Sequence, residues 1–191
     1  MNELLFKKAQ NGDLEAFETI IKSYEKLIYN AAYRMMGNAH DAEDASQEVI
    51  LKVYRSISSC NSMGAFKSWL FRIINNTCID EIRKRKGKTT ISLDADYGDV
   101  DSHSENPLLK DEETPETEFM RNDLNKDIQA AIDKLPDDYK SVVVMRDING
   151  LSYEDIAEAL EINIGTVKSR IARGRKKLRD ELVAMEVFGS S

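Results

Sequence analysis

One segment limits how this chain can fold, because it separates two stretches of apolar periodicity with a run of acids. Residues 89–120 contain ten Asp or Glu and a single Lys, without a repeating apolar pattern. Carboxylates at this density repel one another and extend the backbone, and Pro107 and Pro115 oppose a helix around them. We therefore predict two small domains, residues 1–88 and 121–191, joined by a flexible acidic linker.

The linker also explains the charge of the whole chain. The 191 residues have a formal net charge of −7 at pH 7, and the linker alone contributes −9. Residues 1–88 carry +3 and residues 121–191 carry −1, so the two domains together are slightly basic. The acidic total therefore does not exclude a nucleic-acid partner, because local charge decides what binds.

Three further features limit the class of protein to which this chain can belong. No run of 18 apolar residues is present, so we expect no membrane span. The first residues lack a basic patch followed by an apolar stretch, so we expect no secretory signal. The two cysteines, Cys60 and Cys78, form no CxxC pair, which is typical of a reducing compartment and argues against structural zinc. These features favour a cytoplasmic protein without direct membrane insertion.

In the first domain, apolar residues recur every three or four positions, as on the buried stripe of a helix. The first such set is Phe17, Ile20, Ile21, Tyr24, Leu27, Ile28, Ala31 and Met35. It predicts one helix that ends at Gly37. A second helix is expected over residues 41–57, and a third begins at Phe66 after a loop at residues 60–64. No segment alternates as a β-strand does, so we predict an N-terminal helical bundle.

The second domain has the pattern of four shorter helices. They are expected near residues 118–134, 137–149, 152–160 and 165–187. The last two have the spacing of a helix-turn-helix, with Ala157 and Ile162 near the crossing and Val167 and Ile171 on the buried side. Glu161 occupies the turn position that often takes Gly, where a left-handed backbone costs about 1 kcal/mol. The whole chain is therefore predicted to be all-α.

A basic helix follows that turn. Residues 168–179 carry seven positive charges and no acid. The second helix of a helix-turn-helix enters the DNA major groove with its N-terminal turn, where hydroxyls and guanidinium groups reach base edges or phosphates. The residues expected at this leading end are Thr166, Lys168, Ser169, Arg170 and Arg173. A merely solvated basic helix is the alternative, but the preceding helix and turn favour DNA binding.

Two sets of motifs, in order along the chain, resemble the extracytoplasmic-function (ECF) group of bacterial sigma factors in the sigma-70 family. Residues 135–139, 150–157 and 162–170 resemble region 4, which reads the −35 promoter element. Residues 41–49 look like the helix that grips the clamp helices of RNA polymerase. Residues 66–76, followed by the basic residues 83–86, look like the part of region 2 that opens and reads the −10 element.

The resemblance implies a non-enzymatic protein, without cofactor or metal, that binds core RNA polymerase and directs promoter-specific transcription initiation. The implied polymerase contacts are Asp41, Asp44, Gln47 and Glu48. The implied −10 contacts are Phe66, Lys67, Asn76, Asp80 and Arg83, with a loop pocket at residues 60–65 for a flipped base. The linker would thread through the polymerase towards the path of nascent RNA.

The family also implies a partner that holds the factor inactive, an anti-sigma factor that is often membrane-bound. Several positions depart from the family pattern, among them Ile50, Asn75, Asn163 and Ala172, and they leave the −35 sequence preference open.

Three alternatives compete with this interpretation. An all-α metalloenzyme could use Asp41, Asp44 and Glu48 on one helix face with residues 80–81, but no His joins them and no phosphate loop or nucleophile motif is present. A one-component or response-type regulator would place a sensor or receiver domain before the helix-turn-helix, and a receiver would alternate strands and helices. An adaptor that does not bind DNA would leave residues 83–88 and 168–179 without a use.

Overall fold

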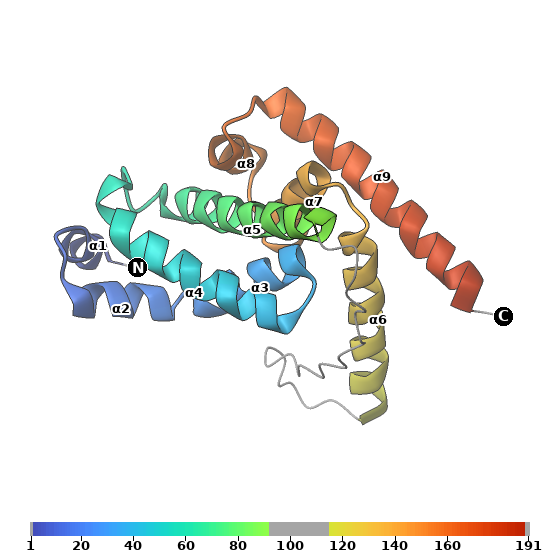
Figure 1. Ribbon diagram of the computed structural model, residues 1–191. Coiled ribbons are helices and arrows are strands. Elements are labelled where there is room, and N and C mark those ends of the chain that lie inside the picture. Colours follow the sequence, from blue (N-terminus) through green and yellow to red (C-terminus); the bar gives the residue numbers. More distant parts are fainter. Residues whose placement is uncertain (1, 92–114, 190–191) are drawn as a thin grey trace.

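The structure, a computed structural model, describes residues 2–91 and 115–189, with side chains described for 2–87 and 124–185. Within these residues every regular element is helical (Figure 1), which confirms the all-α prediction. The first part comprises α1 (Glu3–Gln10), α2 (Leu14–Lys22), α3 (Glu25–Met36), α4 (Ala39–Ser56), the 3₁₀ turn η1 (Ile57–Ser59) and α5 (Phe66–Ile91). The second comprises α6 (Pro115–Asp133), α7 (Asp137–Val143), the π-helical turn η2 (Val144–Ile148), α8 (Tyr153–Leu160) and α9 (Ile164–Gly189).

The structure changes two of the predicted boundaries. The single helix expected from Phe17 to Met35 is wrong: α2 and α3 are separate, because Ser23 and Tyr24 form a tight turn in which the Tyr24 N–H donates to the Ile21 carbonyl at 2.7 Å. The apolar periodicity did not reveal this break, because the turn keeps Tyr24 on the buried side, where its ring packs edge-on against Phe66.

The ends of the predicted linker also differ from the structure. α5 continues to Ile91, and α6 begins at Pro115, so both ends of the range 89–120 are helical. Proline suits the first position of a helix, since its missing N–H is one that the first turn leaves unbonded anyway. The middle of the predicted linker, residues 92–114, lies outside the described residues.

Short polar side chains set the starts of the N-terminal helices. Asn2, Asp13 and Asn38 accept hydrogen bonds from backbone N–H groups in the first turns of α1, α2 and α4. Such caps satisfy donors that the helix itself cannot pair. Gly37 ends α3 in the left-handed conformation, with φ of +84°, so α4 can turn back to pack along α3.

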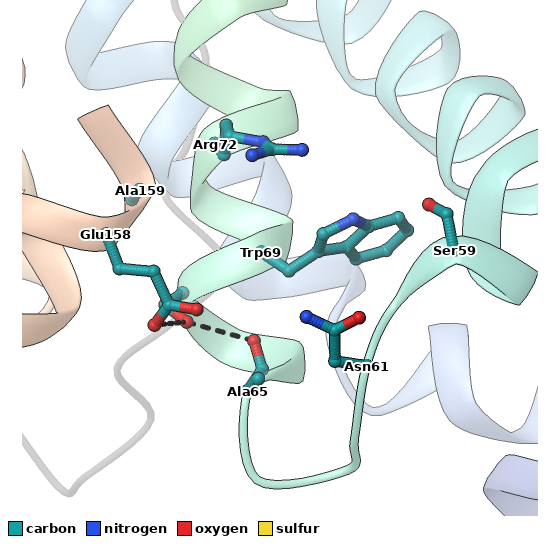
Figure 2. Close-up of a pocket in the computed structure, with 8 residues that line it drawn as sticks. Ser59, Asn61, Ala65, Trp69, Arg72, Glu158 and Ala159 are labelled. Atoms are coloured by element: carbon teal, nitrogen blue, oxygen red, sulfur yellow. Dashed lines mark hydrogen bonds between the residues drawn. The ribbon is translucent and has the colours of Figure 1, made fainter. Parts of the chain in front are cut away.

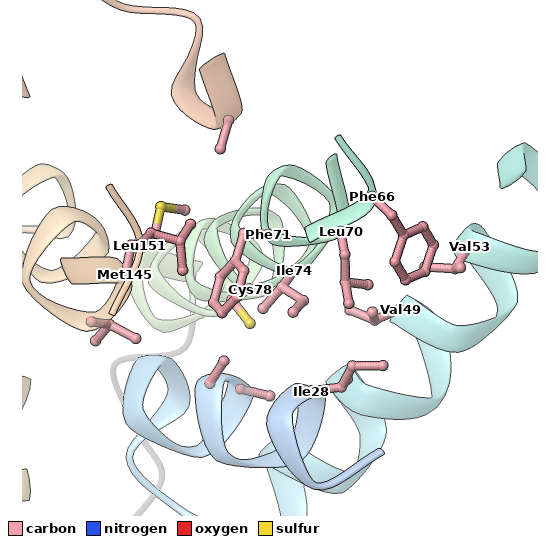
Figure 3. Packing of buried hydrophobic residues seen from close by; sticks show 14 of the residues in the cluster. Ile28, Val49, Val53, Phe66, Leu70, Phe71, Ile74, Cys78, Met145 and Leu151 are labelled. Carbon is pink, nitrogen blue, oxygen red and sulfur yellow. The ribbon is translucent and has the colours of Figure 1, made fainter. Parts of the chain in front are cut away.

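Phe66 is the centre of the first domain's core. Its fully buried ring contacts those of Phe6, Tyr24 and Trp69 at centroid distances of 5.6, 5.1 and 5.8 Å. Figure 3 shows this ring beside Val53 of α4, with Leu70, Ile74 and Phe71 continuing along α5. Cys78 of α5 is also fully buried, and its burial raises the pKa of the thiol to about 12.

The helix-turn-helix has the local chemistry that its turn requires. Ser152 and Asp155 form a reciprocal capping box at the start of α8. Glu161 ends α8 in the left-handed region with φ of +55°, as its place in the turn predicted. Asn163 Oδ1 accepts from the Thr166 N–H at 2.8 Å and so caps the first turn of α9. These contacts set where α8 begins and ends and where α9 begins.

The two domains pack against one another, an arrangement that the sequence did not predict. In Figure 1, α8 lies beside α5, and α6 passes the end of α3. Met145 and Leu151 of the second domain belong to the same buried cluster as Phe71 and Ile74 of α5 (Figure 3). The described residues thus share one continuous core.

Candidate polymerase and nucleic-acid interfaces

The helix predicted to bind polymerase, α4, has one buried and one exposed face. The buried face consists of Ala42, Ala45, Val49 and Val53. Asp44 and Gln47 are exposed on the other side, and Glu48 is partly exposed beside Lys52, with 3.7 Å between Oε1 and Nζ. This face is therefore accessible to a partner.

Two apolar side chains on α4 were missed by the sequence interpretation. Leu51 and Tyr54 remain 47% and 45% exposed, close to the turn that carries Gln47 and Glu48. Large apolar side chains among charges on a surface are typical of a protein interface. Their signal in the sequence was their position outside the inward stripe that includes Val49.

Asp41 lies apart from this exposed face. The Asn38 amide and the Arg85 guanidinium both donate to Asp41 Oδ2, and only 18% of the Asp41 side chain is exposed. Asp41 therefore ties the start of α4 to α5. The four predicted polymerase contacts therefore do not form a single surface, because Asp41 is held in an ion pair with Arg85 inside the protein.

The −10 candidates on α5 divide into accessible and inaccessible residues. Asn76, Asp80 and Arg83 are exposed and follow one another at helical spacing. Phe66, by contrast, is 0% exposed. Its ring offers no face to a base, so the −10 contact predicted for Phe66 is wrong, and the side chain packs in the core instead. Lys67 is partly buried, with its amine directed to the second domain.

The loop predicted to hold a flipped base does border a cavity, of about 90 Å³. Its lining residues are Ser59, Asn61, Ala65, Ser68, Trp69, Arg72, Glu158 and Ala159. Figure 2 shows the indole of Trp69 between the loop and α5, with Glu158 approaching from α8 on the opposite side. One wall of this pocket is thus provided by the second domain, which the sequence could not indicate.

The basic residues at the end of α5 are paired with acids. Besides the Arg85–Asp41 contact, Lys84 Nζ lies 2.6 Å from Glu81 Oε1, and Lys86 Nζ lies 3.0 Å from Asp137 Oδ2 at the start of α7. A cation held by a carboxylate must exchange that partner before it binds a phosphate. Lys84, Arg85 and Lys86 are therefore engaged within the protein, whereas Arg83 is exposed.

The leading end of α9 is presented on the surface. Val167 and Ile171 are buried, and this orients Lys168, Ser169 and Arg173 towards solvent. The candidates of this helix that bear cations and hydroxyls therefore share an accessible face, as DNA contact requires.

Two other residues of α9 are bound within the domain. Thr166 is held by Asn163, to which both its N–H and its hydroxyl donate. Arg170 is 27% exposed in its side chain, and its Nη2 lies 2.7 Å from Asp138 Oδ2 of α7. The structure thus separates the five −35 candidates by exposure: Lys168, Ser169 and Arg173 are exposed, although the Ser169 hydroxyl donates to the Thr166 carbonyl at 3.0 Å, whereas Thr166 and Arg170 are partly buried.

The carboxylates raised by the metalloenzyme alternative are dispersed. Among the residues that the structure describes, no group of three or more His, Cys, Asp or Glu has the arrangement to hold a metal ion. None of the described helices is both long enough and apolar enough to cross a bilayer.

Each of the two domains matches a known protein family. A family described as Sigma-70 region 2 matches residues 20–88, and one described as Sigma-70, region 4 matches residues 125–178. The ECF RNA polymerase sigma factor SigW of Bacillus subtilis is 40% identical over 177 residues, which are 92% of this chain and 94% of that protein. The ECF RNA polymerase sigma-E factor of Haemophilus influenzae is 34% identical over 185 residues, 95% of each chain.

Solved structures have the same fold. The sigma factor RpoE of Bartonella quintana, in complex with the anti-sigma factor NepR, is similar with a TM-score of 0.68 and 25% identity, over 88% of this chain and 98% of that one. CnrH, in complex with the cytosolic domain of CnrY, has a TM-score of 0.68 at 21% identity, over 95% and 97% of the two chains. With the helix-turn-helix and the exposed basic helix, these likenesses show that the chain belongs to the ECF group of sigma-70 family factors, non-enzymatic proteins that direct promoter-specific transcription initiation.

Proposed function

We propose that three surfaces divide the work of initiation between two domains. Residues 1–88 form the region-2 domain, which binds core RNA polymerase and reads and melts −10 DNA. Residues 121–191 form the region-4 domain, which reads −35 DNA. Residues 89–120 connect them along the polymerase. This assignment fits the separate matches of the two regions to residues 20–88 and 125–178.

The polymerase surface is the exposed face of α4. Asp44, Gln47 and Glu48 supply polar contacts, while Leu51 and Tyr54 supply apolar area that leaves water on binding. Interfaces of this kind gain most of their affinity from a few central apolar or aromatic side chains, with charged neighbours at the rim. Asp41 acts indirectly, by fixing the start of α4 through Arg85.

The −35 surface is the leading end of α9, and its outward face is the observation that carries the proposal. Lys168, Ser169 and Arg173 point away from the buried Val167 and Ile171. In the major groove these side chains would hydrogen-bond base edges and phosphates. Arg170 contributes from the flank of the same helix, where Asp138 orients it.

The −10 surface consists of the exposed residues Asn76, Asp80 and Arg83 of α5 together with the loop pocket and Lys67. Amide and carboxylate side chains read the hydrogen-bonding edges of unstacked bases, and the cations bind the backbone. Because these residues line one helix, they can follow a single strand after the duplex opens.

The partners follow from this role. Core RNA polymerase and promoter DNA are both in the cytoplasm, which is where we place the protein. A solved relative is bound to an anti-sigma factor, and we propose a regulator of that kind for this chain as well.

Run-off transcription with purified core polymerase on a promoter library tests the proposal. We expect Arg173→Ala to lower output from −35-dependent templates about tenfold, while core binding in a pull-down stays normal. Arg179→Ala, an exposed arginine further along α9, is the matched control and should change output less than about twofold. Equal output from Arg173→Ala and wild type would remove the −35 assignment.

A further inference from the structure

The loop of residues 60–65, to which the proposed function assigns a flipped base, is held at its start by α1. Gln10, the last residue of α1, is partly buried and donates through Nε2 to the Cys60 carbonyl at 2.7 Å and to the Ile57 carbonyl at 3.4 Å. Both carbonyls belong to the 3₁₀ turn η1 and its C-terminal residue, where a helix leaves acceptors unpaired. A single side chain of α1 thus binds the backbone where it enters the loop.

The bond to Cys60 also fixes the direction of the next residue. A peptide unit is planar and trans, so its carbonyl and its N–H point in opposite directions. Because the Cys60 carbonyl is directed to Gln10, the Asn61 N–H points away from α1. Asn61 lines the cavity at the loop, and Figure 2 shows its side-chain amide beside the indole of Trp69. The backbone that carries Asn61 is therefore oriented by a hydrogen bond from α1.

The other end of the loop contacts α1 through aromatic rings. Phe6 is buried, and its ring packs edge-on against that of Phe66, the first residue of α5, with 5.6 Å between the centroids. Phe66 in turn contacts Trp69 at 5.8 Å. Phe6 and Gln10 are four positions apart, so they lie on one face of α1. That face contacts both ends of the loop, one by a hydrogen bond and the other by ring packing.

The hydrogen bonds inside the loop are local. The Ala65 N–H donates to Ser62 Oγ at 3.2 Å, and Cys60 Sγ donates to the Ser62 carbonyl at 3.4 Å. Bonds over two or three residues shape a turn, but they do not orient it relative to the helices around it. Asn61, Ser62 and Gly64 are exposed. The orientation of the loop on the domain therefore depends on its two ends, which α1 contacts.

The end of α1 that carries Gln10 is itself anchored. Gly12 turns the chain with φ of +90°, and Asp13 caps α2 by accepting from the Ala16 N–H at 3.0 Å. The turn between α1 and α2 is therefore short and fixed at both sides. These residues lie outside the match to Sigma-70 region 2, which begins at residue 20. The support of the loop thus comes from a part of the chain that precedes the matched region.

We propose that Gln10 is a positioning residue for the base pocket, and that α1 sets how strongly the loop discriminates among bases. The inference rests on the proposed −10 role of the loop. Gln10 itself makes no contact with DNA. It holds the peptide between Cys60 and Asn61, so that Asn61 meets a base in one geometry. Recognition of a base edge needs donors and acceptors at fixed positions, so a loop released from α1 binds different bases more equally.

The test uses holoenzyme assembled from each variant and purified core polymerase. It is bound to a single-stranded DNA library randomised over the −10 element, and sequencing of the bound fraction gives the base preference at each position. Gln10→Met keeps the length of the side chain and removes its donor, and Gln10→Glu replaces the donor with acceptors. Asn61→Ala identifies the position that the loop reads. Asn11→Ala removes an exposed amide from the adjacent residue and is the matched control.

We expect both Gln10 variants to lower the base preference about fivefold at the position where Asn61→Ala lowers it. The preferences at the other positions, and all those of the control, should stay unchanged. Each preference is a ratio within one protein preparation, so a smaller amount of folded holoenzyme does not alter it. An equal loss at every position would mean that Gln10 only supports the fold of the domain, and it would overturn the proposal.

Two further outcomes separate failure of this inference from failure of the proposed function. If Asn61→Ala lowers the preference at one position and the Gln10 variants do not, the loop reads a base without support from Gln10. The inference is then wrong, and the −10 assignment stands. If neither Asn61→Ala nor the Gln10 variants change the preference at any position, the loop is not a base pocket, and the inference fails together with that part of the proposed function.

Discussion

Two helices of this molecule carry the candidate DNA contacts, and they differ in how the fold presents them. The leading end of α9 has its apolar residues on one side only, so Lys168 and Arg173 face solvent. The first half of α5 is buried on two sides, by α3 and α4 of its own domain and by α8 of the other. Lys67 and Arg72 are therefore already bound by acceptors. A basic residue in a DNA-binding motif is thus not by itself an available one.

The largest effect that tests this difference is on stability. We expect Phe66→Ala on α5 to lower the free energy of unfolding by about 3–5 kcal/mol, because the ring fills the centre of an aromatic cluster and its removal leaves a cavity. Lys168→Ala on α9 should change stability by less than about 0.5 kcal/mol, as expected of a surface residue. Urea denaturation followed by circular dichroism measures both. Similar costs for the two variants would contradict the one-sided burial of α9.

Polymerase binding offers the next test, since the proposed surface is the face of α4 that stays exposed when the two domains pack together. Glu48→Lys should weaken core polymerase affinity about tenfold, because a charge is reversed beside the exposed Leu51 and Tyr54. Glu18→Lys, an exposed acid on α2, is the control. A normal pull-down with Glu48→Lys would remove this face from the polymerase interface.

Arg170 distinguishes direct DNA contact from support of α9. Arg170→Ala should lower −35-dependent transcription by about fivefold while polymerase binding remains intact. Asp138→Asn removes the ion-pair partner, 2.7 Å away, and should reduce output less than Arg170→Ala does, because the guanidinium remains. Equal losses would mean that Arg170 acts only through Asp138, and unchanged output from Arg170→Ala would exclude any role in recognition.

Salt should produce the smallest effect. Exposed ion pairs such as Arg72–Glu161 weaken as ionic strength rises, because mobile ions screen the charges. Raising NaCl should therefore increase the accessibility of Trp69 to acrylamide, a neutral quencher, by less than about twofold. The apolar contacts of Met145 and Leu151 limit the change. A decrease in accessibility would indicate that the polar contacts do not hold the second domain against α5.

Much of the secondary structure and of the candidate site could be predicted from local pattern. Helical spacing placed α4 and the helix-turn-helix to within a few residues, and the left-handed turn at Glu161 was expected from its position. The break between α2 and α3 at Ser23 was not predicted, because the turn does not interrupt the apolar stripe. Leu51 and Tyr54 were not predicted as part of the polymerase surface, because only their position outside that stripe distinguishes them in the sequence.

The sequence by itself determined what each segment is: helical, basic or acidic, and similar to one family in two separate regions. Those properties are local, since they depend on neighbours a few positions apart. Only the tertiary structure decided which charges are free. Asp41 pairs with Arg85 and Glu161 with Arg72 across 44 and 89 positions of sequence. Contacts between residues so distant depend on how the domains pack, and periodicity along the chain contains no information about them.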